Sequence, residues 1–226
     1  MNELSNPIIM DFPLRGEWWV FHTPAKVIPS HGTDQLGQRY AYDFLMVDWN
    51  RKGTPFYKSS KLKYNTLGVK LKECYGWGKE IYAPCEGRVI IAKDGIIERN
   101  RVHMLRDMAV VLKNAFFFNP KKHDLNKVVG NYIIIDYGNN IYAFFAHLQT
   151  GSVKVKEGQD VKKGEVLGQL GHSGNSTAPH LHFHLMDSPD FFNAKGVPCA
   201  FNKYEEFDKG AWISVKNGFP KDRIRL

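Results

Sequence analysis

Cysteine is scarce in this sequence, with three residues among 226 and no C-x-x-C spacing. An odd number of unpatterned cysteines argues against a disulfide framework and against a metal site built on thiolates. Cys74, Cys85 and Cys199 are therefore expected to be free thiols in or near the core.

Long apolar runs are also missing. No segment approaches the roughly 20 apolar residues that a membrane-spanning helix needs, so no membrane span is expected. The first residues, MNELSNP, have neither the basic start nor the continuous apolar stretch of a secretory signal. Three readings stay open: the chain remains in the cytoplasm, leaves by another route, or is recorded without its leader.

Acidic residues are fewer than basic ones, 23 against 31, which gives a formal net charge of +8. A basic surface favours anionic partners such as nucleic acid, anionic lipid or acidic wall polymers. The positive residues are scattered along the chain, and no zinc-finger spacing or aromatic RNA-binding motif accompanies them. We therefore expect a solvated basic face and no nucleic-acid partner, while an anionic wall polymer stays open as a partner.

Helical periodicity is scarce, and apolar alternation with β-branched or aromatic runs dominates. Six segments are predicted as strands: 40–47, 87–92, 108–112, 131–136, 140–147 and 180–186. Between residues 153 and 168 glycine recurs every several residues, which suits a small and sharply curved sheet. The predicted fold class is all-β and mainly antiparallel, with a curved sandwich-like or barrel-like core of the duplicated hybrid type.

A single domain is expected over residues 1–226. Residues 50–79 and 95–128 interrupt the strand pattern and are each too short to bury a core of their own, so we expect two long insertions in one β core. Residues 188–226 are expected to form an aromatic, irregular tail that packs back on the core.

Three histidines alternate with apolar residues in the segment HLHFHLM at 180–186. Residues two apart in a strand share a face, so His180, His182 and His184 project together. An ordinary amphipathic strand would carry mixed Thr, Ser and Lys on that face. The pattern favours a metal or catalytic site. A further histidine, His147, ends the apolar strand YAFFAHL, and by itself would more often be a core or rim residue.

Four motifs, taken in order, resemble those of the lysostaphin-type (LytM-like) zinc endopeptidases, which cut peptidoglycan cross-bridges. They are APCEGRV at 83–89, FAHL at 145–148, VKEGQDVKKGEVLG at 155–168 and HLHF at 180–183. The family patterns are A-P-x-x-G-x-V, Y-A-H-L, V-x-x-G-x-x-V-x-x-G-x-x-[IL]-G and H-L-H-F. The match covers about residues 31–187 and is interrupted by the two insertions.

The first family motif, H-x-x-x-D, is altered in this chain. His31 is followed by Asp34 three residues later and by Asp43 twelve residues later. Asp43 lies in the strand-like segment YAYDF, which is similar to the family's ligand strand. Asp34 lies in a Gly-Thr-Asp turn, where an Asx-turn cap is the expected role. Asp43 is therefore the predicted ligand.

The resemblance implies one zinc ion per chain, held by His31, Asp43 and His182, with a fourth position open for water. It also implies that His147 and His180 are catalytic residues, which relay the proton of that water and stabilise the oxyanion. His184 is expected either to orient a ligand or to lie on the strand surface. The other histidines have no motif partner and are expected at the surface or rim; they are His22, His103, His123 and His172.

The implied function is that of a zinc metalloendopeptidase whose substrates are stem or cross-bridge peptides of peptidoglycan. Such a substrate would place the protein outside the cytoplasm. Two alternatives are a non-catalytic regulator of another wall hydrolase and a histidine phosphocarrier. Regulators with this fold typically lose zinc ligands, which this chain retains, and paired phosphocarrier histidines do not account for Asp43. The bond that is cut stays open.

Overall fold

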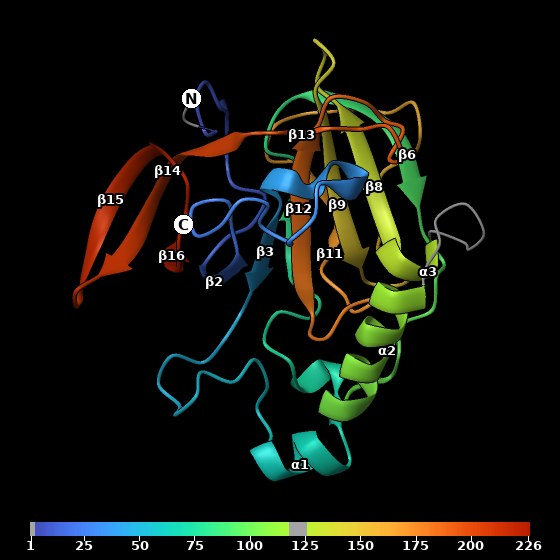
Figure 1. The fold of residues 1–226 in the computed structure, drawn as a ribbon, viewed down its shortest axis with the longest axis vertical. Helices are drawn as coiled ribbons and strands as arrows, with labels where there is room; N and C mark the ends of the chain where they lie inside the picture. Colours follow the sequence, from blue (N-terminus) through green and yellow to red (C-terminus); the bar gives the residue numbers. More distant parts are fainter. Residues whose placement is uncertain (1–2, 118–125) are drawn as a thin grey trace.

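The structure is a computed structural model that describes residues 3–117 and 126–226 (Figure 1). Its strands are β1 (Ile8–Met10), β2 (Glu17–His22), β3 (Tyr42–Leu45), β4 (Val69–Lys70), β5 (Glu80–Tyr82), β6 (Gly87–Lys93), β7 (Arg101–Val102), β8 (Asn131–Asp136), β9 (Tyr142–Leu148), β10 (Asp160–Val161), β11 (Val166–Gln169), β12 (His180–Met186), β13 (Gly196–Val197), β14 (Cys199–Asp208), β15 (Ala211–Gly218) and β16 (Arg223–Arg225). The helices are α1 (Lys61–Thr66), α2 (Met104–Phe117) and α3 (Asn126–Val129), with short 3-10 segments η1 (Gln35–Tyr40) and η2 (Leu71–Glu73). The predicted β fold class is confirmed.

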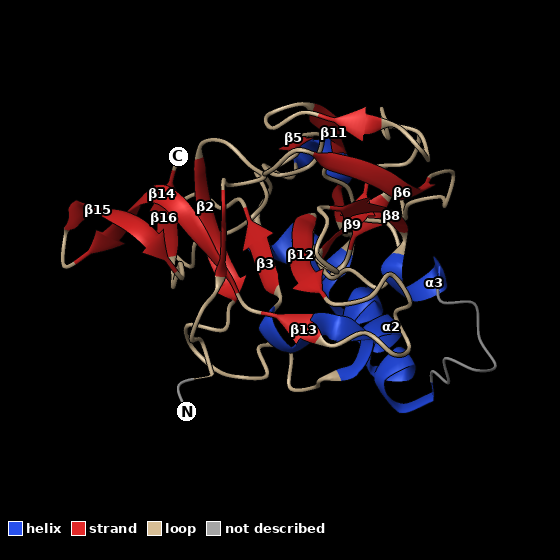
Figure 2. Cartoon of the chain, turned by 90° about the horizontal axis from the view of Figure 1, so that it is seen from above, coloured by secondary structure: helices blue, strands red, loops and turns tan. Residues whose placement is uncertain are grey.

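Within the described residues, a twelve-stranded sheet forms the body of the protein. Its order is β1-β14-β16-β2-β3-β12-β9-β8-β6-β10, with β13 beside β12 and β15 beside β14. The central pairs are antiparallel, and β1 with β14 is a parallel pair. The separate ribbon of β5 and β11 lies across from this body (Figure 2). The main core draws on both parts of the structure: it includes Ile81, Leu167, Phe145, Phe183 and Phe201.

The three central strands have one face in that core and the other face toward the candidate site. Phe44 of β3, Phe145 of β9 and Phe183 of β12 belong to the main core. Since successive side chains alternate, Asp43 and His182 are directed to the opposite face. The core therefore sets the orientation of the site residues on these strands.

Residues 108–112 were predicted as a strand, and this prediction is wrong because they lie inside helix α2. Over only five residues, an apolar run cannot be assigned to a strand or a helix by periodicity. Met104, Met108 and Val111 recur three to four residues apart, which places them on one helical face.

The C-terminal tail does pack on the core, but the prediction that it is irregular is wrong. Strand β14 pairs with β15 and β16, and β16 pairs with β2. Cys199, Phe201 and Tyr204 contribute buried side chains to the main core. In Figure 1 the β14–β15 hairpin extends away from the rest of the sheet.

The described parts of the two insertions associate with each other. Strand β4 of the first pairs with β7 of the second. Together they bury a small apolar cluster of Tyr57, Val69, Leu71, Cys74 and Val102. We call residues 50–79 and 95–117 the insertion lobe; α1 lies at its lower end in Figure 1. Residues 118–125 of the second predicted insertion lie outside the described residues.

All three cysteines are free; Cys74 and Cys199 are buried, and Cys85 is half-buried. The prediction of free thiols in or near the core is confirmed. Among the described helices, none has the length and apolar character to cross a membrane.

Candidate metal centre and active site

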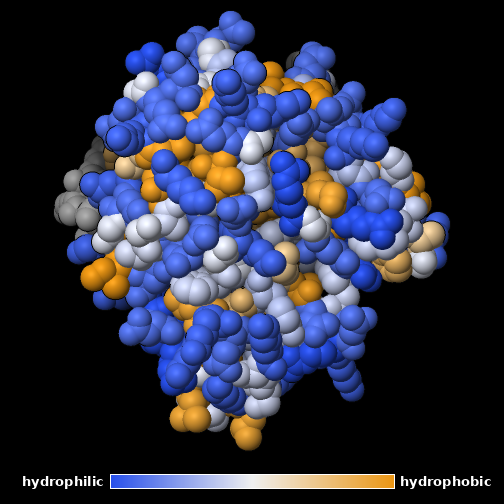
Figure 3. All heavy atoms as spheres, turned by 180° about the vertical axis from the view of Figure 1, so that it is seen from behind, coloured by the Kyte–Doolittle hydropathy of each residue, from blue (hydrophilic) through white to orange (hydrophobic). Residues whose placement is uncertain are grey.

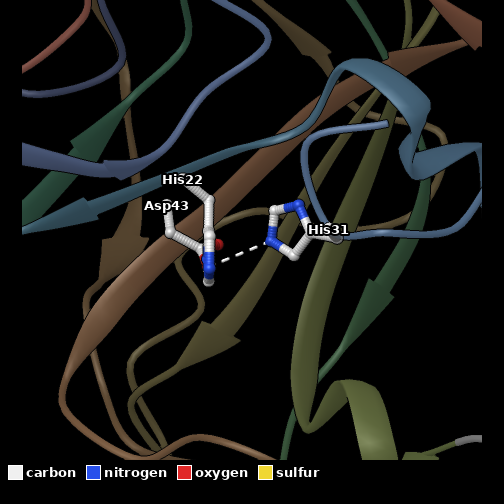
Figure 4. Close-up of side chains that lie close together, drawn as sticks. All are labelled: His22, His31 and Asp43. Atoms are coloured by element: carbon white, nitrogen blue, oxygen red, sulfur yellow. Dashed lines mark hydrogen bonds and ion pairs between the residues drawn. The ribbon is translucent and has the colours of Figure 1, made fainter. Parts of the chain in front are cut away.

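Asp43 of β3 lies at the centre of a group of histidines. Its Oδ2 atom is 3.0 Å from His31 Nε2 and 2.7 Å from His22 Nδ1. Its Oδ1 atom is 2.9 Å from His182 Nδ1 and 3.6 Å from His180 Nε2. Figure 4 shows His22 and His31 next to the carboxylate of Asp43. The structure thus brings the three predicted ligands His31, Asp43 and His182 together.

Strand register accounts for part of this arrangement. His182 and Asp43 are directly paired residues of the antiparallel strands β12 and β3, so their side chains lie on the same face. His31 comes from the loop before η1, where Ser30 Oγ lies 3.1 Å from its Nδ1 atom. This contact on one ring nitrogen leaves the other, Nε2, directed at Asp43.

His22 was expected at the surface or rim with no partner, and its contact with Asp43 was missed. Period-two alternation would put His22 on the core face with Val20. The pairing of β2 with β3 shifts register between Val20 and His22, so Phe21 is an extra residue and His22 comes opposite Asp43. A one-residue bulge of this kind leaves no signature in the apolar pattern.

In the described part of the chain, one set of three residues has ligand atoms close enough together to hold a metal ion. His22, His31 and Asp43 each offer one ligand atom within 4.8 Å of the others. The predicted set shares His31 and Asp43 and has His182 in place of His22. The side chain of His22 is 39% exposed, whereas that of His182 is 10% exposed.

His147 is also placed by a bulge. In the β8–β9 ladder, Tyr132 pairs with Ala146 and Asn131 pairs with Leu148, which leaves His147 unpaired. Its φ of 64° is left-handed, which is uncommon for a residue other than glycine. Alternation alone would direct His147 into the main core with Phe145, so the bulge is what turns its ring toward the site.

The two predicted catalytic histidines are anchored in the same manner. His147 Nδ1 lies 2.9 Å from the carbonyl oxygen of Ser173, and His180 Nδ1 lies 2.7 Å from that of Ala178. A carbonyl oxygen only accepts, so each Nδ1 carries the hydrogen and each Nε2 is the free basic nitrogen. The two rings lie next to each other, with centroids 4.7 Å apart.

His184 orients His182. Its ring is buried against Phe144, and its Nδ1 atom lies 3.1 Å from His182 Nε2. The expectation that it lies on the strand surface is wrong. The other expected role, orienting a ligand, fits the geometry, because His182 contacts His184 through Nε2 while its Nδ1 faces Asp43.

Burial and neighbouring charges set the protonation of the site. Burial alone would raise the pKa of Asp43, but the surrounding histidines, His31 and His180 foremost, hold it well below its usual value. Burial lowers the pKa of His182, and lowers the pKa values of His147 and His184 strongly. A charged Asp43 beside a neutral His182 is the protonation state that a divalent cation requires of these two groups as ligands.

The insertion lobe holds the loop that precedes His180. The guanidinium of Arg99 donates to the carbonyl oxygens of Gly174 (2.8 Å) and Ser176 (2.5 Å). Ser176 Oγ in turn lies 3.1 Å from His180 Nδ1. A residue of the second insertion therefore supports the backbone that carries a predicted catalytic histidine.

Asp107 and His172 complete this support. Asp107 is buried on α2 and lies 3.2 Å from Arg99 Nε and 3.6 Å from His172 Nε2. His172 Nδ1 lies 3.1 Å from Ser176 Oγ. His172 was expected at the surface or rim, and this is wrong because its side chain is fully buried.

Two remaining expectations concern polar residues away from the centre. Asp34 does not cap η1 through its side chain, which is exposed and forms an ion pair with Arg39. The Asx-turn role is therefore wrong, and Asp34 takes no part in the Asp43 group. His103 Nε2 contacts the backbone oxygen of Thr66 at 2.9 Å on the insertion lobe, and His123 lies outside the described residues.

A cleft of about 630 Å³ runs past these histidines. The sheet face forms one side, with Trp19 and Phe21 of β2 near the metal candidates. The insertion lobe contributes Phe56, Tyr64, Met104, Met108 and Val111. The described residues around the cleft are largely apolar, and none of these is Lys or Arg.

Comparison with known proteins confirms the resemblance inferred from the motifs. Residues 118–195 match the model of Peptidase family M23. The matched range contains His147, His180 and His182, whereas His31 and Asp43 precede it.

Similar proteins include the peptidoglycan DD-endopeptidase ShyA of Vibrio cholerae, 40% identical over 57 residues, which are 25% of this chain and 13% of that protein. The glycyl-glycine endopeptidase ALE-1 of Staphylococcus capitis is 36% identical over 74 residues, 33% of this chain and 20% of that protein. The similarity thus spans only 13% to 20% of the length of these relatives. The solved catalytic domain of lysostaphin from Staphylococcus simulans is 23% identical, with a TM-score of 0.34 over 65% of this chain and 89% of that one.

Proposed function

We propose that this protein is a zinc metalloendopeptidase that hydrolyses peptide bonds in peptidoglycan stem or cross-bridge peptides. One observation carries the proposal: two groups of histidines meet at one cleft. His31 and His182 converge on Asp43, while His147 and His180 present free Nε2 atoms beside them. The similarity to relatives named peptidoglycan DD-endopeptidases supports the choice of substrate.

His31 Nε2, the carboxylate of Asp43 and His182 Nδ1 would hold one zinc ion. Two neutral nitrogens and one carboxylate oxygen suit a catalytic zinc, and the three cysteines take no part in the group. We prefer His182 to His22 because it is buried and its other nitrogen is fixed by His184, as is usual for an oriented ligand. When bound, zinc supplies Lewis-acid polarisation of a water molecule and of the peptide carbonyl.

His147 and His180 move the proton. Each ring is anchored through Nδ1, so its Nε2 is held in position to accept the proton of the attacking water. The protonated ring can then donate to the leaving amine or to the negative oxygen of the tetrahedral intermediate. The lowered pKa of buried His147 keeps that ring neutral before the proton transfer.

The cleft accounts for access by an extended peptide. It leads past both groups of histidines, and its apolar sides exclude water from the polar groups at the reacting centre. Among the described residues of its lining Asp43 is the acidic one, so negative charge is concentrated where the metal would bind.

The test is to measure bound zinc and then incubate the zinc-loaded protein with purified peptidoglycan. New amino termini found by mass spectrometry, absent with His180→Ala, are the expected result. Cleavage of sugar bonds alone would contradict the proposal. So would a folded, zinc-loaded protein that releases nothing but stimulates a separate wall hydrolase, because that result would identify a regulator.

A further inference from the structure

The positive charge of this protein is concentrated in the insertion lobe. Residues 50–79 hold eight Lys or Arg and one acidic residue, and residues 95–117 hold four Lys or Arg and two acidic residues. The lobe therefore carries a net charge of +9, against +8 for the whole chain. Two stretches that look unrelated along the sequence form one basic surface because the tertiary structure joins them.

The acidic residues of the lobe do not neutralise this surface. Glu73 is paired with Lys63 at 2.8 Å. The buried Asp107 is paired with Arg99 and Arg106. Glu98, the third acidic residue, accepts hydrogen bonds from the backbone N–H groups of Thr150 and His172. The other basic side chains of the lobe have no ion-pair partner among the described residues; they include Lys58, Lys61, Lys70, Lys72 and Arg101.

Large aliphatic side chains are exposed at the tip of the same lobe. Leu62 and Leu67 at α1 are 74% and 71% exposed, and Leu105 at the start of α2 is 65% exposed. Contacts between the two insertions place them in one region: Arg101 donates to the Leu67 carbonyl oxygen, and α1 contacts α2. Figure 3 shows apolar side chains at this lower end of the molecule, bordered by hydrophilic ones.

We propose that the tip of the insertion lobe binds the surface of a membrane that contains anionic lipid. Basic residues near an anionic bilayer attract it electrostatically, and exposed aliphatic side chains beside them can enter the interfacial region. The lobe also forms one side of the cleft, through Tyr64, Met104 and Met108. Docking by the tip would hold the cleft close to the membrane. This proposal does not depend on the proposed function.

The exposed leucines favour a lipid surface over a nucleic acid or a wall polymer. Polyanions in water are bound by charge, hydrogen bonds and, for unpaired bases, aromatic stacking. Here the most exposed large apolar side chains described at the tip are leucines, whereas Phe56, Tyr57 and Tyr64 pack in the lobe's own apolar cluster. Aliphatic groups presented to solvent contribute to binding only where an apolar phase can receive them.

The experiment is co-sedimentation of the full chain with vesicles of phosphatidylcholine alone and of phosphatidylcholine mixed with phosphatidylglycerol. Binding is expected only to the mixed vesicles and should weaken as salt is raised. Lys61→Gln with Lys70→Gln should lower the partition coefficient by about fivefold per residue. Leu62→Ser with Leu67→Ser should lower it by roughly tenfold, since the interface gains less apolar area.

Matched controls come from the β14–β15 hairpin. Lys203 and Lys216 are exposed and pair across that hairpin, and Ile213 is 48% exposed. Lys203→Gln with Lys216→Gln, and Ile213→Ser, should bind vesicles as the unchanged chain does. Absence of binding to phosphatidylglycerol at low salt, or equal losses in lobe and hairpin variants, would overturn the proposal. The proposal also fails if the Leu62→Ser, Leu67→Ser variant binds vesicles normally and a DNA duplex fully displaces the protein from the vesicles. The lobe would then be a surface that binds any polyanion.

Discussion

Asp43 and His182 face each other on the neighbouring antiparallel strands β3 and β12, with Asp43 Oδ1 2.9 Å from His182 Nδ1. These residues are 139 positions apart in the sequence and belong to different motifs. Their strands share the main core through Phe44 and Phe183, so the register that packs the core also sets the pair.

Removal of a ligand should release the metal. Asp43→Ala and His182→Ala each delete one of three proposed ligands. Loss of a residue that only orients a ligand already lowers metal affinity by about 10- to 100-fold, so here zinc affinity should fall by well over 100-fold. Asp34→Ala and His22→Ala should retain zinc. Competition with a chelator measures all four. Loss of zinc from His22→Ala with retention in His182→Ala would identify His22, His31 and Asp43 as the ligands instead.

Substitution of the proposed proton-transfer residues should lower turnover without releasing zinc, unlike substitution of the ligands. His147→Ala and His180→Ala leave the ligand set intact, so zinc should remain bound while turnover falls by about 100- to 10,000-fold. His103→Ala, on the insertion lobe, serves as the control and should change neither quantity. The division of roles is wrong if His180→Ala loses zinc as readily as His182→Ala.

Stability of the metal-free protein should fall as the pH is lowered. Burial lowers the pKa values of His147, His172 and His184 below the usual value of 6.5. Below about pH 6.5 these histidines become protonated in the unfolded chain but stay neutral in the folded chain. Proton binding therefore favours the unfolded state. Urea denaturation in the presence of a chelator should therefore give a higher free energy of unfolding at about pH 7.5 than at about pH 5.5.

The contribution of His184 to this pH dependence of stability can be measured separately. His184→Gln removes one titrating group, so the fall in stability from neutral to acidic pH should become shallower. A slope unchanged by this substitution would show that His184 does not titrate differently in the folded and unfolded chains.

Gly174 should not tolerate a side chain. Its φ is +69°, and a Cβ atom there would lie 2.5 Å from the backbone nitrogen of Gly130 and the carbonyl oxygen of Val128. Gly174→Ala should destabilise the protein by more than the roughly 1–2 kcal/mol of a left-handed alanine. Gly151, with a φ of +76° and nothing within 4 Å of a Cβ, is the matched control because only the backbone cost applies. Equal losses of melting temperature for the two substitutions would show that the loop around Gly174 can shift.

The charge of Asp107 should support the loop that carries His180. Asp107→Asn keeps the shape of the side chain but leaves the half-buried Arg99 without its partner, so we expect a loss of roughly 3 kcal/mol of stability. Turnover should fall with bound zinc unchanged, because the affected contacts run through Ser176 to His180. Asp34→Asn, at an exposed ion pair, is the control and should change stability by less than about 1 kcal/mol. Unchanged turnover in a destabilised Asp107→Asn would limit the residue to a role in folding.

Local sequence patterns determined much of the sheet. Strands β8 and β12 were predicted to the residue, because strict alternation or a continuous apolar run between turn residues is a local property. The same alternation put His180, His182 and His184 on one face. The spacing of linked motifs likewise identified the similarity to lysostaphin-type peptidases, since motif order does not depend on the coordinates.

Only the tertiary structure decided the remaining features. Two bulges, at Phe21 and at His147, direct His22 and His147 to the site face, and bulges depend on strand pairing. Helix α2 could not be separated from a strand because its apolar run was short and its packing partners lie in another insertion. Scattered basic residues became one surface for the same reason: contacts between distant segments, such as β4 with β7, bring together charges that the linear sequence keeps apart.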